Sequence, residues 1–290
     1  MKREYYFWVV GGDLRQVRLA QLLQMDGHTV QTYAMERRET KEALSGSDTL
    51  NGIERCDCVI LPLPAVGEGG ILNAPLSDRK VPLSAVAGRL KPGQILCGGK
   101  LDAEFVRSAR EKGCRVYDYF EREELAVKNA VPTVEGAIQI AMEELPTTLF
   151  GARVLVIGYG RVGRLLAHRL KGLGARVTVS ARSFRDLAWI EAYGYCAEHT
   201  DQLAGWLCSY DLIINTVPAQ VLGEAALEDV SSDCLIIDLA SRPGGVDFES
   251  AAALGLKVIW ALSLPGKVAP LSSGQIIRDT VYHILQEAEP

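Results

Sequence analysis

Three glycines in one short stretch have the spacing of a phosphate-binding turn. They lie in the segment GYGRVG, at positions 158, 160 and 163. In such a turn the first glycine permits a tight bend, the second lets the backbone approach a pyrophosphate, and the third lets a helix pack close to a strand. The N-terminus of that helix offers unpaired N–H groups and a partial positive charge. The residues expected to contact a dinucleotide are Gly158, Tyr159, Gly160, Arg161, Val162 and Gly163.

The elements that must position this turn are visible on both sides of it. Residues 154–157 are apolar and mostly β-branched, which is typical of a buried parallel strand. Apolar residues then recur at helical spacing up to Leu173, and residues 176–181 form a second predicted strand. A glycine pattern alone is weak, because such glycines often serve only a turn. The flanking strand and helix favour dinucleotide binding over that alternative.

The end of the second predicted strand distinguishes between the two nicotinamide dinucleotides. An NAD site usually has Asp or Glu there, bonded to the ribose 2′-hydroxyl. This chain has Ser180, Ala181, Arg182 and Ser183 instead. Arg182 could pair with a 2′-phosphate, and the serine hydroxyls could add hydrogen bonds. We therefore expect NADP, the alternative being that Arg182 is a solvated arginine at the start of the next helix.

Size, charge and cysteine content narrow the class of protein. A chain of 290 residues suggests two domains, and a net charge of −5 argues against a general nucleic-acid surface. No apolar run approaches the length of a membrane span, and the N-terminus lacks the pattern of a signal peptide, so we expect a cytoplasmic protein without membrane contact. The seven cysteines are irregularly spaced, which favours buried thiols over a metal site.

Strand and helix patterns alternate through both halves of the chain. They predict an α/β protein with two doubly wound, Rossmann-like domains, joined by a helix and separated by a cleft. The expected domains are residues 1–130, which would bind substrate or a partner, and residues 151–273, which would bind NADP. Residues 131–150 form the connecting helix, and the C-terminal helix over 274–290 is a candidate to return to the first domain.

The first half opens with its own strand, turn and helix. Its turn contains Gly11, Gly12 and Asp13, which is not a dinucleotide pattern because an acid would repel a pyrophosphate. Asp13 is expected to cap the helix that follows. Arg15 lies in the first turn of that helix, either as a ligand for a substrate carboxylate or as a surface arginine. Residues 66–81 have no periodicity and form a loop with the features of a lid.

Pro132 is expected to separate a short charged helix over 121–128 from a longer one over 134–145. Thr133 is then a candidate N-cap of the longer helix. Thr133 and Glu135 are also ligand candidates, because they would begin at the presumed cleft.

Polar residues follow three later strands of the second half. Since the carboxyl ends of parallel strands open on one crevice, we expect them near the cofactor. The alternative for each of these polar residues is a structural role, in a turn, as a helix cap or as a solvated charge. No histidine has the setting of a histidine–acid pair. The further cofactor candidates are Asn215, Thr216, Val217 and Pro218. The further substrate candidates are Ser241, Arg242, Lys267, Ser272 and Ser273.

Five segments of the chain resemble the A-subunit family of dipicolinate synthases from spore-forming bacteria. The resemblance spans nearly the whole chain, and the first, second and last segments are more particular than the glycine motif. The segments are GGDLRQVRLAQLL at 11–23, NAVPTVEGAIQIAMEE at 129–144, VLVIGYGRVG at 154–163, VTVSARS at 177–183 and LPGKVAPLSSGQII at 264–277.

This resemblance implies an oxidoreductase that makes pyridine-2,6-dicarboxylate in the mother cell during sporulation. Its substrate would be a dihydrodipicolinate-level intermediate of lysine biosynthesis, oxidised with NADP, and its partner a flavoprotein-like B subunit. We expect an oligomer and no metal. Arg15, Arg242 and Lys267 would bind carboxylates, helped by Thr133, Ser241, Ser272 and Ser273, with Glu135 as a candidate base. The alternatives are another two-domain NADP dehydrogenase, of the shikimate or methylene-tetrahydrofolate type, and a non-catalytic nucleotide-binding scaffold.

Overall fold

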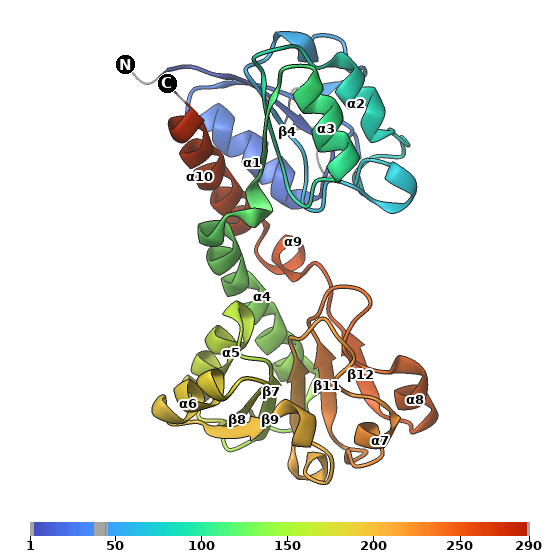
Figure 1. Ribbon diagram of the computed structural model, residues 1–290, viewed down its shortest axis with the longest axis vertical. Coiled ribbons are helices and arrows are strands. Elements are labelled where there is room, and N and C mark those ends of the chain that lie inside the picture. Colours follow the sequence, from blue (N-terminus) through green and yellow to red (C-terminus); the bar gives the residue numbers. More distant parts are fainter. Residues whose placement is uncertain (1–2, 38–43, 45, 289–290) are drawn as a thin grey trace. The chain divides into compact units, whose positions relative to one another are not determined.

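Two separate parallel sheets organise the chain. The computed structural model describes residues 3–37, 44 and 46–288 (Figure 1). The chain divides into a first unit, Met1–Asn129 with Pro265–Pro290, and a second unit, Ala130–Leu264. Helices α4 (Glu123–Glu144) and α9 (Leu264–Val268) each cross a division between the units. The expected C-terminal end of the second domain, residue 273, lies nine residues beyond the observed division, so Lys267, Ser272 and Ser273 are grouped with the first unit.

The second unit is built on six parallel strands in the order β12-β11-β10-β7-β8-β9. The order reverses between β7 and β10, which is where open α/β sheets bind their ligands. The strands are β7 (Arg153–Ile157), β8 (Arg176–Ala181), β9 (Cys196–His199), β10 (Leu212–Asn215), β11 (Leu235–Asp238) and β12 (Lys257–Trp260). The helices are α5 (Arg161–Gly172), α6 (Phe184–Ala192), α7 (Glu224–Leu227) and α8 (Phe248–Ala253), with short 3-10 turns η4 (Thr200–Gln202) and η5 (Leu207–Ser209).

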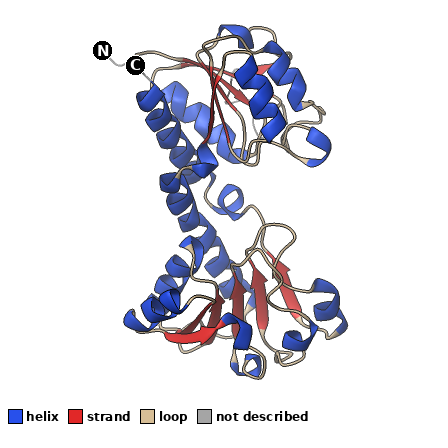
Figure 2. Ribbon diagram, in the orientation of Figure 1, coloured by secondary structure: helices blue, strands red, loops and turns tan. Residues whose placement is uncertain are grey.

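Alternate residues of each strand in this unit face opposite helical layers. Val154 and Val156 pack in one core with α5, α6 and the second-unit part of α4. Leu155 and Ile157 pack in the other core with η5, α7 and α8. Both faces of the sheet are therefore covered, as the continuous apolar strands predict (Figure 2).

The first unit repeats the same sheet order, β3-β2-β1-β4-β5-β6, and all its pairs are parallel. Together the two sheets confirm the predicted pair of doubly wound domains. Its strands are β1 (Tyr6–Val10), β2 (Thr29–Tyr33), β3 (Gly46–Ser47), β4 (Cys58–Ile60), β5 (Ile95–Gly98) and β6 (Arg115–Asp118). Its helices are α1 (Leu14–Met25), α2 (Leu83–Arg89), α3 (Ala103–Glu111) and α10 (Pro270–Ala288), with 3-10 turns η1 (Ile53–Arg55), η2 (Glu68–Gly70) and η3 (Tyr119–Glu121).

The last helix of the chain belongs to the core of the first unit. Val281 and Ile284 of α10 are fully buried in one cluster with Leu19 and Leu23 of α1 and with Phe7 of β1. Helices α1 and α10 lie side by side (Figure 1). The C-terminal helix is therefore grouped with the domain that the first strand begins.

Helix α4 runs without interruption through Pro132, so the expected break between two helices is wrong. Proline lacks an N–H and removes one backbone hydrogen bond from the helix. Packing offsets this loss here, because Val134, Ala137 and Ala141 are fully buried against the second sheet. Thr133 consequently lies inside the helix and is not its N-cap.

The loop over 66–81 is packed against its own unit. Asn73 accepts a hydrogen bond from the Gly12 N–H at 2.8 Å and donates its own N–H to Ala65 at 3.0 Å. Leu72 is buried, and isolated bridges join Val66 to Leu72 and Ile71 to Pro82. The loop therefore covers the first glycine turn. In the polar stretch over 36–56, residues 38–43 and 45 lie outside the described residues.

Candidate functional site

The glycine turn between β7 and α5 has the geometry that its sequence predicts. Gly158 has φ of +100°, and a Cβ there would lie 2.5 Å from Oγ1 of Thr216. A Cβ at Gly163 would overlap the carbonyl oxygen of Gly158, so the helix packs directly on the end of the strand. A Cβ at Gly160 would meet no atom within 4 Å. The middle glycine therefore borders open space, where a phosphate group could approach the backbone.

The N-terminus of α5 has no anion of its own. Its N-cap residue is Gly160, which makes no side-chain cap bond, and its first turn contains no acidic residue. The first N–H groups of a helix have no partner inside the helix. This end combines those donors with a partial positive charge, so the residues present fit the diphosphate of a dinucleotide.

The end of β8 offers an arginine and no acid. The Arg182 side chain is exposed, and its carbonyl accepts a hydrogen bond from Nε2 of His199 at 3.0 Å. Ser183 caps α6, and its hydroxyl also donates to Asp186 at 2.8 Å. Ser180 is fully buried, and its hydroxyl accepts from Thr200 at 3.2 Å. The expectation that Ser180 contacts the cofactor is therefore corrected, because its side chain is fully buried and bonded to Thr200.

Asn215 at the end of β10 is also buried, which corrects the expectation that it contacts the cofactor directly. Its Nδ2 donates to the carbonyl of Val217 at 3.0 Å and to Oδ1 of Asp238 at 2.8 Å. Its Oδ1 accepts the Val217 N–H at 3.0 Å. Asn215 instead positions the residues that follow it, Thr216 and Val217, against Gly158.

Asp238 is a site-positioning residue that the sequence reasoning missed. It is fully buried at the end of β11, and its carboxylate accepts the N–H groups of Ala240 at 2.9 Å and Gly245 at 2.8 Å. It thereby shapes the loop that carries Ser241 and Arg242. The available signal was an acidic residue closing an otherwise apolar strand, in the segment LIID.

Ser241 and Arg242 lie on the exposed loop after β11. The Arg242 guanidinium is placed over the ring of Trp260, 5.9 Å from its centroid. Pro218, after β10, is exposed as well. The segments after β8, β7, β10 and β11 are thus consecutive along one sheet edge, and within the second unit the structure brings together the predicted cofactor segments.

Arg15 has a different position from the one expected for a substrate ligand. It is 6% exposed, and its Nε and Nη2 donate to the Asp13 carboxylate at 2.9–3.1 Å. Nη2 also donates to the carbonyl of Leu63 at 2.6 Å. Asp13 caps α1, as predicted, by accepting the Arg15 N–H. Arg15 therefore already has a carboxylate partner inside its own unit.

The remaining first-unit candidates, Lys267, Ser272 and Ser273, follow a glycine that packs on this ion pair. A Cβ at Gly266 would lie 2.7 Å from Oδ2 of Asp13, so the segment just before α10 packs on the pair. Ser273 is buried and donates its hydroxyl to the carbonyl of Pro265 at 3.0 Å. Lys267 and Ser272 are exposed.

Glu135 does not lie beside the glycine turn. Its carboxylate is 3.6 Å from Nη2 of Arg169, six residues beyond Gly163 on α5. Six helical residues span about 9 Å. This placement gives Glu135 an ion-pair role along the helix rather than a position at the strand ends.

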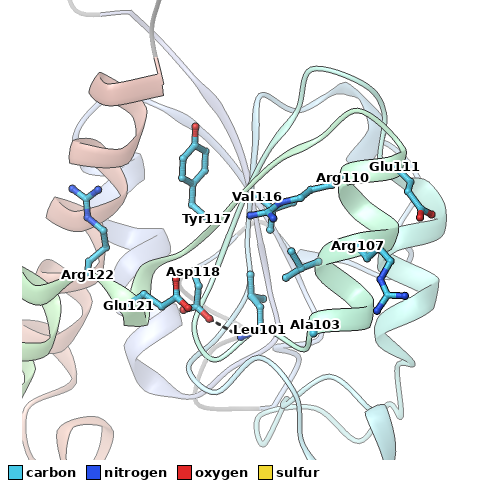
Figure 3. Close-up of a pocket in the computed structure, with 11 residues that line it drawn as sticks. Leu101, Ala103, Arg107, Arg110, Glu111, Val116, Tyr117, Asp118, Glu121 and Arg122 are labelled. Carbon is cyan, nitrogen blue, oxygen red and sulfur yellow. Dashed lines mark hydrogen bonds between the residues drawn. The ribbon is translucent and has the colours of Figure 1, made fainter.

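A hollow of about 1160 Å³ lies elsewhere, along edge strand β6 and helix α3 (Figure 3). Arg110 points across it toward Val116, while Asp118 accepts the N–H of Leu101 at 2.8 Å. It contains none of the predicted site residues. Among residues 3–37, 44 and 46–288, no group of three or more His, Cys, Asp or Glu could hold a metal ion. In those same residues, no helix is long and apolar enough to cross a membrane.

Comparisons with known proteins divide the chain much as the structure does. Residues 6–120 match the model of the N-terminal domain of the dipicolinate synthase A subunit. Residues 121–254 match the NAD-binding domain of D-isomer specific 2-hydroxyacid dehydrogenases. The second match supports a nicotinamide dinucleotide as the cofactor and a dehydrogenase-type chain, in agreement with the open N-terminus of α5.

A curated relative and its crystal structure both match this chain over nearly its full length. The A subunit of dipicolinate synthase from Bacillus subtilis (strain 168) is 34% identical over 285 residues, which are 97% of this chain and 96% of the relative. The crystal structure of the Bacillus subtilis protein has a TM-score of 0.85 at 32% identity, covering 99% of this chain and 97% of the other.

Two further structures distinguish members of one family from proteins that share only the fold. The A subunit of the Bacillus halodurans enzyme has a TM-score of 0.87 at 29% identity, over 99% of this chain and 98% of the other. D-lactate dehydrogenase from Escherichia coli, 15% identical with a TM-score of 0.59 over 98% of both chains, shares the fold alone. With a full-length relative above 30% identity and a matching N-terminal domain, this chain belongs to the A-subunit family of dipicolinate synthases.

Proposed function

We propose that this chain oxidises a dihydrodipicolinate-level intermediate of lysine biosynthesis to pyridine-2,6-dicarboxylate, with NADP as the oxidant. The observation that carries the proposal is the uncapped N-terminus of α5 beside Gly160, in a chain of this family. Membership of an A-subunit family implies a second kind of chain, and we propose that the partner in an oligomeric synthase is a flavoprotein-like B subunit. We place this activity in the cytoplasm of the mother cell of a sporulating bacterium.

The preference for NADP over NAD rests on Arg182. This exposed side chain follows β8, where an NAD site would have an acid for the ribose hydroxyls. In the described part of the chain Arg182 makes no side-chain ion pair. A guanidinium with free donors suits a phosphate dianion. The nearby Asp186 is held by Ser183 at the start of α6.

The chemistry requires little from the protein beyond positioning. NADP, when bound, accepts a hydride, and the substrate loses one further proton as its ring becomes aromatic. The residues of this chain orient the ring and hold its carboxylates. We assign this to Arg242 and Ser241, since both are exposed on the loop that Asp238 shapes. Lys267 and Ser272 remain substrate candidates because both are exposed. We do not assign Glu135 as the base that takes this proton, because its carboxylate pairs with Arg169.

The decisive experiment is a coupled assay on the full chain. The cyclic lysine-pathway intermediate is generated in situ, NADP or NAD is added, and pyridine dicarboxylate is followed by its ultraviolet absorbance. Product from this chain alone, faster with NADP, is the expected result. Product that forms only when the B subunit is present would mean that the active unit is the complex of both chains. No product in either case, with the dinucleotide still bound, would contradict the proposal and favour a dehydrogenase of another substrate class.

Replacing Arg242 with Ala tests the substrate assignment. Loss of a charge-assisted carboxylate contact should raise the substrate KM about 10- to 100-fold, because such a contact contributes about 1.5–3 kcal/mol. The dissociation constant of NADP should change less than about threefold, since one lost cation on another loop leaves the phosphate contacts of the glycine turn in place. Arg185→Ala, a matched loss of an exposed arginine on α6, is the control. Equal effects of Arg242→Ala on substrate and cofactor would refute the assignment.

A further inference from the structure

The outer groove between α5 and α6 contains an unusual concentration of aromatic side chains. The right-handed crossovers of the sheet place both helices on one face, next to each other (Figure 1). The groove holds a hollow of about 420 Å³ that lies wholly in the second unit. Its lining residues are Tyr159, Arg164, His168, Trp189, Tyr193 and Tyr195.

The aromatic walls present flat apolar surface to solvent. Trp189 is 52% exposed and Tyr193 is 62% exposed, and their rings stack with centroids 5.8 Å apart. Burial raises the pKa of Tyr159 and of Tyr195, so both phenols stay neutral and add no negative charge to the hollow. Exposed stacked aromatics of this kind offer a planar ligand a large contact area.

The polar part of the lining is cationic or neutral. The Arg164 guanidinium lies over the Tyr159 ring, 4.8 Å from its centroid, and its Nε donates to the Tyr159 carbonyl at 3.0 Å. The Asp186 Oδ1 atom lies 3.6 Å from both Arg164 and Arg185, so two guanidinium groups share one carboxylate. His168 is exposed and makes no hydrogen bond or ion pair within the described part of the chain.

Flat apolar walls beside a partly free guanidinium and an imidazole favour a ligand that is planar, aromatic and negatively charged. Arginine pairs with carboxylates through parallel hydrogen bonds, and aromatic faces stack on planar rings. We propose that the hollow between α5 and α6 binds a planar aromatic carboxylate, at a site distinct from the strand ends where the dinucleotide would bind. The identification of its natural ligand as the pyridine dicarboxylate product rests on the proposed function.

This hollow is physically joined to the dinucleotide turn. Tyr159 is the residue between Gly158 and Gly160, and Arg164 holds its carbonyl from the first turns of α5. Arg164 also reaches toward Asp186, whose carboxylate accepts the Ser183 hydroxyl after β8. A carboxylate that draws Arg164 away from Tyr159 would therefore alter both cofactor segments. Occupancy of the hollow weakens dinucleotide binding in this proposal, which amounts to inhibition by product.

Calorimetric titration of the full chain with isophthalate tests the site, because this dicarboxylate has the shape of the product without its metal-chelating nitrogen. Isophthalate and pyridine-2,6-dicarboxylate should bind, and heptanedioate, which is flexible and has no ring, should bind at least about tenfold more weakly. Trp189→Leu and His168→Gln should each weaken binding at least about fivefold. Trp206→Leu removes another tryptophan of the second unit, 62% exposed, and should leave the affinity unchanged.

Several outcomes would overturn the proposal. Equal affinity for heptanedioate would mean that charge alone is recognised. Unchanged affinity in Trp189→Leu would place the ligand elsewhere. A ligand-free dimer in which Trp189 is shielded from a soluble quencher, together with no isophthalate binding, would assign the groove to a second copy of the chain.

Arg242→Ala separates this proposal from the proposed function. It should leave isophthalate binding at the hollow intact while impairing turnover. Isophthalate binding without any NADP-dependent oxidation of the intermediate would support the site and contradict the proposed function. Turnover that is insensitive to both Trp189→Leu and added isophthalate would contradict inhibition through the hollow and leave the proposed function intact.

Discussion

The two glycine turns that begin the two units occupy the same place in the same strand order, yet their helix ends differ. Each turn follows the first strand of its sheet, where the strand order reverses. In the first unit, Asp13 caps α1 and its carboxylate also holds the buried guanidinium of Arg15. In the second unit, the N-cap position of α5 is Gly160, which has no side chain to bond the helix end and borders open space.

The ends of the neighbouring strands repeat this difference. Beyond β2, Glu36 accepts hydrogen bonds from the Ser77 hydroxyl at 2.7 Å and from Arg79 at 3.2 Å, so this acid holds a loop of its own unit. Beyond β8, Arg182 is exposed to solvent. A Rossmann-type turn can accept an external phosphate only if its own side chains leave the helix end and the next strand end available. The first unit uses these positions for its own packing.

The largest effect is expected from Asp13→Asn. Asparagine still caps a helix, but it leaves the Arg15 guanidinium, whose side chain is 7% exposed, without its countercharge. Breaking a buried ion pair costs about 3–5 kcal/mol. Hydrogen exchange followed by mass spectrometry should show this loss of protection in the first unit alone. Asp247→Asn, at the N-cap of α8, is the control and should cost less than about 1 kcal/mol. Equal losses in both variants would mean that the pair with Arg15 contributes nothing beyond capping.

Gly163→Ala should have the next largest effect. The added methyl group would overlap the Gly158 carbonyl, which forces α5 away from the strand. Overpacking of this kind costs about 1–3 kcal/mol, and dinucleotide binding should fall below detection because the turn is displaced. Gly172→Ala lies on the same helix with no atom within 4 Å, and it should be neutral or slightly stabilising. Calorimetry for binding and hydrogen exchange for stability would measure both. Retained binding in Gly163→Ala would contradict the assignment of the turn.

Gly160→Asp would convert the second turn into a copy of the first. The new carboxylate can cap α5, which should stabilise the second unit by a few tenths of a kcal/mol, because glycine is only slightly poorer than aspartate at this position. The same carboxylate would occupy and repel the site of a phosphate, so dinucleotide affinity should fall at least about 100-fold. A gain in stability with loss of binding, measured on the same preparation, supports the comparison. Binding that survives the substitution would show that the helix end is not the anion site.

Arg182→Ala should have the smallest effect, and only for one cofactor. A lost phosphate contact should weaken NADP binding about 10- to 100-fold and leave NAD binding unchanged. Arg185→Ala, in the first turn of α6, removes the same charge and serves as the control. Fluorescence titration with both dinucleotides measures the ratio. Parallel weakening of NADP and NAD would mean that Arg182 does not contact a 2′-phosphate.

Patterns of local spacing and polarity were sufficient to predict much of the molecule. The alternating strand and helix patterns indicated both doubly wound domains, and the glycine spacing located the turn at Gly158. The cap at Asp13 also followed from residue type alone. Failures occurred where burial, which is non-local, decides the role. Ser180 and Asn215 are polar residues at strand ends, and only the packed sheet shows that both face inward.

The doubly wound fold class, the open glycine turn and the family could therefore be predicted from the sequence, because they depend on periodicity and on residue types close together in the chain. Three features became visible only in the folded chain: Arg15 is paired, Asp238 shapes the loop of Arg242, and α4 continues through Pro132. In each case the outcome depends on a desolvated space or a packed surface that no local pattern describes. The energies of ion pairing and burial depend on which groups share such a space, and the fold brings those groups together.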